Sequence, residues 1–166
     1  SLADGQYEIR VRAMDVAGNY SDWCYPGTVT VDATPPAAPA IEALDPGYNM
    51  SPIAIGWNDV TDGANAITYV LQYADNAGFS GATSETRSTS DYSFNAEAAG
   101  EGEYWFRVKT ISTVNGSTIP PETKESGWSP IVSTIYDHTG PAAPELMLLT
   151  PDPTNESPQT WSWSAP

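Results

Sequence analysis

The sequence predicts an all-β protein built from antiparallel β-sandwiches, and three observations support this. Apolar and polar residues alternate over short segments such as residues 7–13 and 104–108, the period-2 pattern of strands. Turn-forming Gly, Pro, Asp and Asn separate these segments, as at residues 45–47 and 58–63. No segment has the periodicity of an amphipathic helix. About seven short strands in about 100 residues are typical of a β-sandwich.

An octet rich in proline and alanine occurs twice and organises the chain. Residues 32–39 are DATPPAAP and residues 137–144 are DHTGPAAP, an offset of 105 residues (137 − 32). Residues 5–13 likewise resemble residues 102–110, at an offset of 97 (102 − 5). Because proline fixes φ and favours an extended backbone, the octets are predicted to be stiff linkers between copies of one repeat.

The linkers divide the chain into successive segments. We expect the C-terminal strands of a partial repeat at 1–31, a linker at 32–39, a complete repeat at 40–136, a second linker at 137–144, and the N-terminal strands of a third repeat at 145–166. About 100 residues suffice for an independent core. A pair of strands alone does not, so we expect the partial repeats to be completed by a longer polypeptide or, alternatively, by strand exchange between copies.

The expected strands follow from the pattern in chain order. A hairpin is predicted in the first segment, with a half-buried strand at 7–13 and a β-branched strand at 28–31. The complete repeat should contain short strands at residues 41–44, 53–57, 67–73, 86–88, 92–94, 104–108 and 131–136. No helix is expected.

The charge balance excludes some partners. The chain has 21 acidic and 6 basic residues, a net charge of −15, which disfavours nucleic acid and anionic membrane surfaces. No run approaches the roughly 18 apolar residues of a membrane span, so no direct membrane insertion is expected in this segment. Cys24 is the single cysteine and cannot form an intramolecular disulfide.

Several motifs together resemble the fibronectin type III family. They are Trp57, the Tyr-x-Leu-x-Tyr of residues 69–73, the Gly-x-Tyr-x-x-Arg-Val of residues 102–108, and Trp128 before the last strand. The opening segment is similar to the closing strands of bacterial Ig-like repeats in very long surface proteins. The resemblance implies tandem Ig-like (fibronectin type III-like) antiparallel β-sandwiches with about seven strands per repeat, in an extracellular or cell-surface protein.

One candidate site is a calcium site. Asp15, Asn19 and Asp22 lie in the hairpin loop, and Asp32 opens the linker. Calcium takes six to eight oxygen ligands. The resemblance to the very long bacterial surface proteins, which include giant adhesins, implies that such aspartates bind calcium near the junctions between repeats and thereby stiffen the stalk. The alternative is that Asp and Asn form ordinary turns here. No other cofactor is expected.

A second candidate site lies on the outer face of one strand. Alternation places Trp105, Arg107 and Lys109 opposite the core-facing residues. An exposed tryptophan suggests a glycan platform, and the basic pair, matched by Arg10 and Arg12, suggests lateral contact with an acidic face of another copy. The alternatives are that Trp105 covers the outer face by packing on Arg107 or a neighbouring strand, and that the basic residues pair with acids on neighbouring strands.

Catalysis is not expected. His138, the single histidine, lies in a linker without residues to orient a general base, and Asp59 and Asp62 lie in a loop where carboxylates are ordinarily solvated. We therefore interpret the chain as a non-enzymatic stalk, filament or adhesin spacer of a long tandem-repeat protein. The alternative is a glycan- or protein-binding adhesive module, or an accessory domain of a secreted hydrolase.

Overall fold

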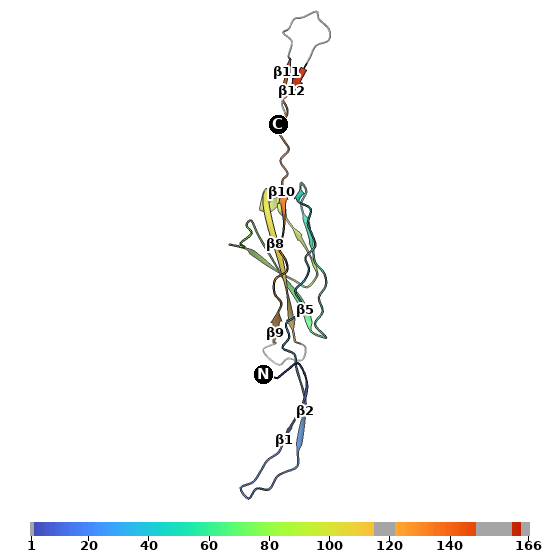
Figure 1. The fold of residues 1–166 in the computed structure, drawn as a ribbon, viewed down its shortest axis with the longest axis vertical. Coiled ribbons are helices and arrows are strands. Elements are labelled where there is room, and N and C mark those ends of the chain that lie inside the picture. Colours follow the sequence, from blue (N-terminus) through green and yellow to red (C-terminus); the bar gives the residue numbers. More distant parts are fainter. Residues whose placement is uncertain (1, 115–121, 149–160, 164–166) are drawn as a thin grey trace, which may run out of the picture.

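The computed structural model describes residues 2–114, 122–148 and 161–163. These residues form strands and a single helical turn, arranged along one long axis (Figure 1). The strands are β1 (Gly5–Val11), β2 (Cys24–Val31), β3 (Gly47–Tyr48), β4 (Ile53–Gly56), β5 (Ala66–Ala74), β6 (Thr83–Arg87), β7 (Asp91–Phe94), β8 (Gly102–Thr113), β9 (Thr123–Glu125), β10 (Val132–Tyr136), β11 (Leu146–Leu148) and β12 (Trp161–Trp163), and the turn is α1 (Ala96–Ala99).

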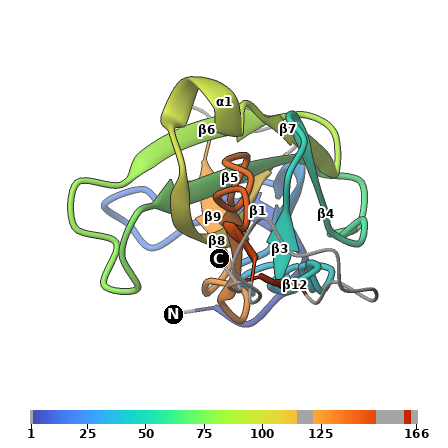
Figure 2. The same ribbon diagram turned by 90° about the horizontal axis from the view of Figure 1, so that it is seen from above.

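Strands β3 to β10 form a two-layer sandwich (Figure 2), which lies in the middle of the molecule (Figure 1). The larger sheet has the order β3-β10-β8-β5-β6, with β9 paired to the far end of β8. The smaller sheet is β4-β7, extended by a bridge between Ile41 and Trp57. All pairs are antiparallel except β3 with β10. The predicted all-β antiparallel sandwich is confirmed.

The core lies between the two sheets. Ile53 and Ile55 of β4 and Phe94 of β7 meet the large sheet at Phe106, where the Phe94 and Phe106 rings are 5.2 Å apart in an edge-to-face contact. These four side chains are at most 2% exposed. Burial of this apolar surface is the main stabilising term of the sandwich.

The first expected strand of the repeat, at residues 41–44, is not formed. Ile41 makes only the bridge to Trp57, and the chain then crosses to the larger sheet, where β3 pairs in parallel with β10. Pro46 lies at the crossing; it has no amide hydrogen to donate, and its carbonyl accepts from Ile135 N at 3.2 Å. The segment therefore contributes to both sheets instead of forming one strand.

Two short elements also differ from expectation. Helix α1 is a single turn capped by Asn95, whose side chain accepts from Ala98 N at 3.2 Å, and one turn is too short to show helical periodicity. Strand β9 has three residues and forms by pairing with β8 rather than through an apolar pattern of its own. The edge strand expected at 86–88 is found as β6, slightly earlier in the chain.

The hairpin β1-β2 projects from one end of the sandwich, and β11-β12 lies beyond the other end (Figure 1). The face of β1 predicted to be half-buried is largely exposed, with Ile9 at 45% and Val11 at 58% exposure. The reason is that no second sheet covers this face among the described residues. No described helix is long and apolar enough to cross a membrane.

Candidate functional site

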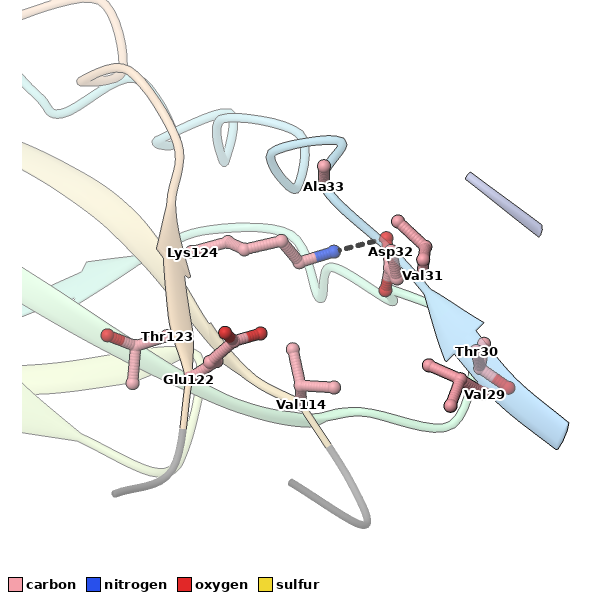
Figure 3. Close-up of a pocket in the computed structure, with 9 residues that line it drawn as sticks. All are labelled: Val29, Thr30, Val31, Asp32, Ala33, Val114, Glu122, Thr123 and Lys124. Carbon is pink, nitrogen blue, oxygen red and sulfur yellow. Dashed lines mark ion pairs between the residues drawn. The ribbon is translucent and has the colours of Figure 1, made fainter. Parts of the chain in front are cut away.

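The junction between the hairpin and the sandwich is organised by one lysine. Lys124 of β9 places its Nζ 2.6 Å from Oδ1 of Asp32, the first residue after β2, and 2.8 Å from Oδ2 of Asp62 in the loop between β4 and β5. Figure 3 shows the Lys124 side chain reaching from the sandwich to Asp32. The lysine side chain is only 10% exposed. Its charge therefore joins two segments that are far apart in sequence.

Further donors connect the same two carboxylates. Asn65 Nδ2 donates to Asp32 Oδ2 at 2.9 Å and to Asp62 Oδ2 at 3.2 Å. Ser112 Oγ, from the fully buried side chain of a β8 residue, donates to Asp62 Oδ2 at 2.6 Å. Asp62 Oδ2 thus accepts from Asn65 and Ser112 and forms an ion pair with Lys124, and both oxygens of Asp32 are engaged. The result is a closed polar ring across the junction.

The ring keeps its members charged. The hydrogen bond from Lys124, followed by that from Ser112, lowers the pKa of Asp62 from 3.8 to about 2. Desolvation of Lys124 acts to lower the lysine pKa, but the hydrogen bonds to Asp32 and Asp62 outweigh it, so the pKa of Lys124 is raised. Lys124 and Asp62 therefore carry their full charges at neutral pH.

A cleft of about 570 Å³ lies beside this ring (Figure 3). Val29 and Val31 of β2 form one wall, and Val114 with Thr123 forms the other. The lining is mixed, with apolar side chains facing one another and Lys124 and Asp32 at the edge. The cleft follows from two sheets meeting end to end without a continuous apolar interface.

A carboxylate also holds the first linker from the hairpin side. Asp4 accepts hydrogen bonds from Ala33 N at 2.7 Å, from Thr34 N at 3.2 Å and from Thr34 Oγ1. The Thr34 hydroxyl is the first cause of the lowered pKa of Asp4. The start of β1 is thereby tied to the chain that leaves β2.

The second linker is held in the same way. Glu101 Oε1 accepts from His138 N at 2.9 Å and from Thr139 Oγ1 at 2.7 Å, and the Thr139 hydroxyl is the first cause of its lowered pKa. Glu101 follows Asp4 by 97 residues (101 − 4), and Thr139 follows Thr34 by 105 (139 − 34). We refer to the two arrangements as the linker clamps.

Other hydrogen bonds of the hairpin also have counterparts at matching sequence positions in the sandwich. Tyr7 donates from its hydroxyl to Ala3 O at 2.8 Å, as Tyr104 does to Gly100 O at 2.9 Å. This is the tyrosine corner common in β-sandwiches. A serine Oγ accepts a backbone amide in both places, from Ala13 N at 3.0 Å for Ser21 and from Thr110 N at 2.8 Å for Ser126. Hairpin β1-β2 therefore has the bonding pattern of the β8-β10 edge.

The predicted binding residues lie together on the outer face of β8, but two of them have partners there. Arg107 has its guanidinium 4.1 Å from the Phe79 ring centroid and 4.4 Å from that of Trp128, and it donates to Gln72 Oε1 at 2.7 and 3.0 Å. Lys109 Nζ lies 2.5 Å from Glu125 Oε2. Trp105 is half-buried on the same face.

The matched basic pair of the hairpin is stacked as well. Arg10 lies 4.4 Å from the ring centroid of Trp23, and Arg12 lies 4.5 Å from Trp23 and 3.7 Å from Tyr20. Cation–π contacts at exposed sites contribute about 0.5–1 kcal/mol. Acidic partners were expected for these basic residues from the sequence, whereas Arg10, Arg12 and Arg107 stack on aromatic rings.

The predicted calcium ligands do not all converge. Asp15 accepts from Ala17 N and Asn19 N through Oδ1 and from Asn19 Nδ2 through Oδ2, each at 2.9 Å, an Asx-type turn. The Asn19 side chain is the first cause of the lowered pKa of Asp15. Asp22 follows this loop at the tip of the hairpin, whereas Asp32 lies at its base with Lys124. Within the described ranges, no group of three or more His, Cys, Asp or Glu residues has the placement to hold a metal.

Comparisons with known proteins found little. No family model matches the chain, and no curated protein matches it. One solved structure with which it aligns is described as "Crystal structure of chicken CNTN1 FN1-FN3 domains". The chain is 17% identical to it with a TM-score of 0.44, and the alignment covers 95% of this chain and 52% of that one. The chain therefore spans about half the length of the chain that it matches.

Sequence reasoning missed the residues that form the junction. Asp62 was interpreted as a solvated loop carboxylate, and Lys124 was not singled out, because nothing in the sequence indicates that they lie near Asp32. The linker clamps had a detectable signal, since an acid precedes the Gly-x-Tyr motif in both copies at Asp4 and Glu101. His138 and Cys24 are exposed, and His138 Nδ1 lies 3.1 Å from Asn49 O.

Proposed function

We propose that this chain is a non-enzymatic structural segment, a stalk, filament or adhesin spacer, of a long extracellular or cell-surface protein made of tandem repeats. The observation that carries the proposal is the Asp32–Lys124–Asp62 bridge, which ties the end of one repeat to the body of the next. The linker clamps and the correspondence of bonds between hairpin and sandwich support it.

The bridge and the first linker clamp act on neighbouring residues of the chain. Asp4 fixes residues 33 and 34 to the preceding repeat, while Lys124 fixes Asp32 to the following repeat. Pro35 and Pro36 then limit rotation in the next peptide units. A linker held from both sides restricts the angle between its neighbours, which is the mechanical property that a spacer needs.

The adhesive alternative draws less support from the geometry. A glycan or protein site on β8 would use Trp105, Arg107 and Lys109, but Arg107 and Lys109 are engaged with partners inside the repeat. A new ligand would have to displace those partners. A stacked and paired basic face serves the cohesion of the sheet without any external ligand.

Small-angle X-ray scattering of the chain tests the proposal. We expect an extended particle with a single preferred orientation of hairpin and sandwich. The variant Asp4→Asn with Lys124→Met should broaden the distribution of orientations, because it weakens both attachments of the linker. Lys109→Met is the control, since it removes one positive charge away from the junction. A wild-type profile that fits freely jointed bodies would contradict the proposal.

Cell-surface location is a separate part of the proposal. An antibody raised against residues 40–136 should label intact, unpermeabilised cells of the source organism, or detect the protein in the medium. Labelling that requires permeabilisation would rule out the extracellular assignment while leaving the mechanical role of the junction untouched.

A further inference from the structure

Arg10 and Arg12 of the hairpin are the exposed cations of this acidic chain, since the other four basic residues are at least partly buried. Among the described residues, no hydrogen bond or ion pair engages either guanidinium. We propose that this pair binds carboxylates of a second copy of the chain and that copies associate side by side through it. The inference deepens the proposed function and rests on it, because lateral contact of this kind joins stalks into a filament.

Aromatic rings hold both guanidiniums in place. The Trp23 ring centroid lies 4.4 Å from Arg10 and 4.5 Å from Arg12, and the Tyr20 centroid lies 3.7 Å from Arg12. A guanidinium carries its five N–H donors around the edge of a plane, so a ring stacked on the flat face leaves the donors open. The binding edges are therefore ordered before any partner arrives, which lowers the entropy lost on binding.

The matched arginine of the sandwich shows what such an edge binds. Arg107 corresponds to Arg10 at the offset of 97 residues (107 − 10), and it stacks on Trp128 as Arg10 stacks on Trp23. Its Nε and Nη2 both donate to Gln72 Oε1, at 3.0 and 2.7 Å. The edge of Arg107 is thus occupied by an oxygen acceptor, whereas the edge of Arg10 is open.

The second cation of each pair shows the same difference. Lys109 corresponds to Arg12 (109 − 12 = 97), and its Nζ lies 2.5 Å from Glu125 Oε2. The residue that corresponds to Glu125 in the hairpin is Tyr20 (125 − 20 = 105), which supplies a ring and no carboxylate. The hairpin therefore has the stacked half of this arrangement without its acidic half.

The sandwich of a neighbouring copy can supply the missing carboxylates. Residues 40–136 include 12 acidic and 4 basic residues, a net charge of −8 (4 − 12), whereas residues 1–31 include 4 acidic and 2 basic residues, a net charge of −2 (2 − 4). The hairpin projects from its own sandwich (Figure 1), so its outer face is accessible to a staggered neighbour. A carboxylate presents two oxygens that match the edge of a guanidinium.

An acidic glycan is the competing occupant. A sugar ring would stack on Trp23, but this ring is already in contact with both guanidiniums and is therefore less available. The contact between copies should be weak for single chains, because exposed ion pairs each strengthen an association by only about 1.4- to 5-fold. Repetition along a long array would multiply it.

A dilution series of the full chain provides the first test. NMR resolves the Nε–H group of each arginine, and the Arg10 and Arg12 signals should shift as sedimentation detects association. The Arg107 signal is the internal control, since its Nε already donates to Gln72. A chain that stays monomeric at every concentration, or that associates without a shift of the Arg10 and Arg12 signals, would overturn the inference.

Charge removal provides the second test. Arg10→Gln with Arg12→Gln should weaken association by about 10-fold in sedimentation equilibrium. The matched control is Arg107→Gln with Lys109→Gln, which removes the same charge at the corresponding positions and should leave association unchanged. Equal losses from both variants would mean that net charge alone governs association, and the proposed contact would be wrong.

Chemical cross-linking identifies the occupant, and it still decides if the glutamine variant does not form the hairpin. Arg10→Lys with Arg12→Lys keeps both charges and introduces amines that a carbodiimide couples to carboxylates in contact. In a mixture of ¹⁴N and ¹⁵N chains, we expect mixed-isotope links from positions 10 or 12 to acids within 40–136. Links confined to single chains would overturn the inference, as would polygalacturonate that shifts the Arg10 and Arg12 signals at lower concentration than the chain itself. Scattering at low concentration decides separately whether the junction is rigid.

Discussion

Thr139 donates its hydroxyl hydrogen to Glu101 Oε1 at 2.7 Å, and this bond holds the second linker against the start of β8. The same relationship exists between Thr34 and Asp4 at the first linker. At both linkers, a threonine hydroxyl thus donates to a carboxylate that lies 30 or more residues earlier in the chain. These bonds therefore fix the direction in which residues 33–34 and 138–139 leave the strands that precede them.

Replacing Glu101 with Gln should loosen the second linker. The neutral amide is a weaker acceptor than the carboxylate for the His138 amide and the Thr139 hydroxyl. We expect faster hydrogen exchange at the His138 amide, with the core amides of β8 unchanged. Glu103→Gln, two residues further along the chain in β8, is the matched control, and equal effects from both variants would contradict the clamp.

Ile9 and Phe106 occupy corresponding positions in residues 5–13 and 102–110, and comparing them tests the core. Phe106 is 0% exposed and Ile9 is 45% exposed, although they occupy corresponding positions. Phe106→Ala should destabilise the sandwich by about 3–5 kcal/mol in denaturant unfolding. Ile9→Ala should change that stability by at most about 0.5 kcal/mol. A large loss from Ile9→Ala would show that another surface covers the hairpin face.

Acid should weaken the junction in a defined pH window. The pKa of Asp62 is lowered from 3.8 to about 2, so its folded form binds protons less readily than its unfolded form. Its stabilising contribution is therefore complete above the ordinary pKa and is lost as the pH falls from about 4 through about 2. NMR titration of Asp62 measures this shift, and Lys124→Met should raise the midpoint. An unchanged midpoint would show that Lys124 does not cause the lowered pKa of Asp62.

Arg107 should matter for stability and not for assembly. Its guanidinium lies against Phe79 and Trp128, so Arg107→Ala should cost about 1 kcal/mol and alter the fluorescence of Trp128. Arg107→Lys should recover only part of this, because an ammonium lacks the planar surface that stacks on the rings. If the basic face instead binds another copy, Arg107→Glu would reduce self-association measured by sedimentation, a result that would favour the lateral contact.

The strands with strong alternation were predictable from sequence. Tyr104, Phe106 and Val108 were expected to face inward, and all three are buried in β8. The outward placement of Trp105 followed from the same period, because successive strand residues face opposite sides. The repeat of the proline-rich octet also revealed the corresponding positions at which the linker clamps were later found.

The junction was not predictable, for a physical reason. Asp32, Asp62 and Lys124 belong to a linker, a loop and a three-residue strand, none of which has a periodic pattern. Their contact depends on how the ends of two sheets meet, which local propensity does not encode. Likewise, the apolar residues at 41–44 indicated a strand. In the structure, Ile41 bridges to Trp57 in the smaller sheet, and the chain has reached the larger sheet by Pro46. This change of sheet depends on tertiary packing, which local sequence does not encode.

The parallel pair β3-β10 has a mechanical consequence for a chain pulled from both ends. Tension enters ahead of β3 and leaves after β10, so the two strands are drawn in opposite directions along their length. Their bonds, Ile135 N to Pro46 O at 3.2 Å and Asp137 N to Tyr48 O at 2.9 Å, are then loaded together in shear. The antiparallel hairpin β1-β2 would instead open one bond at a time. In single-molecule pulling, the sandwich should therefore rupture at higher force than the hairpin.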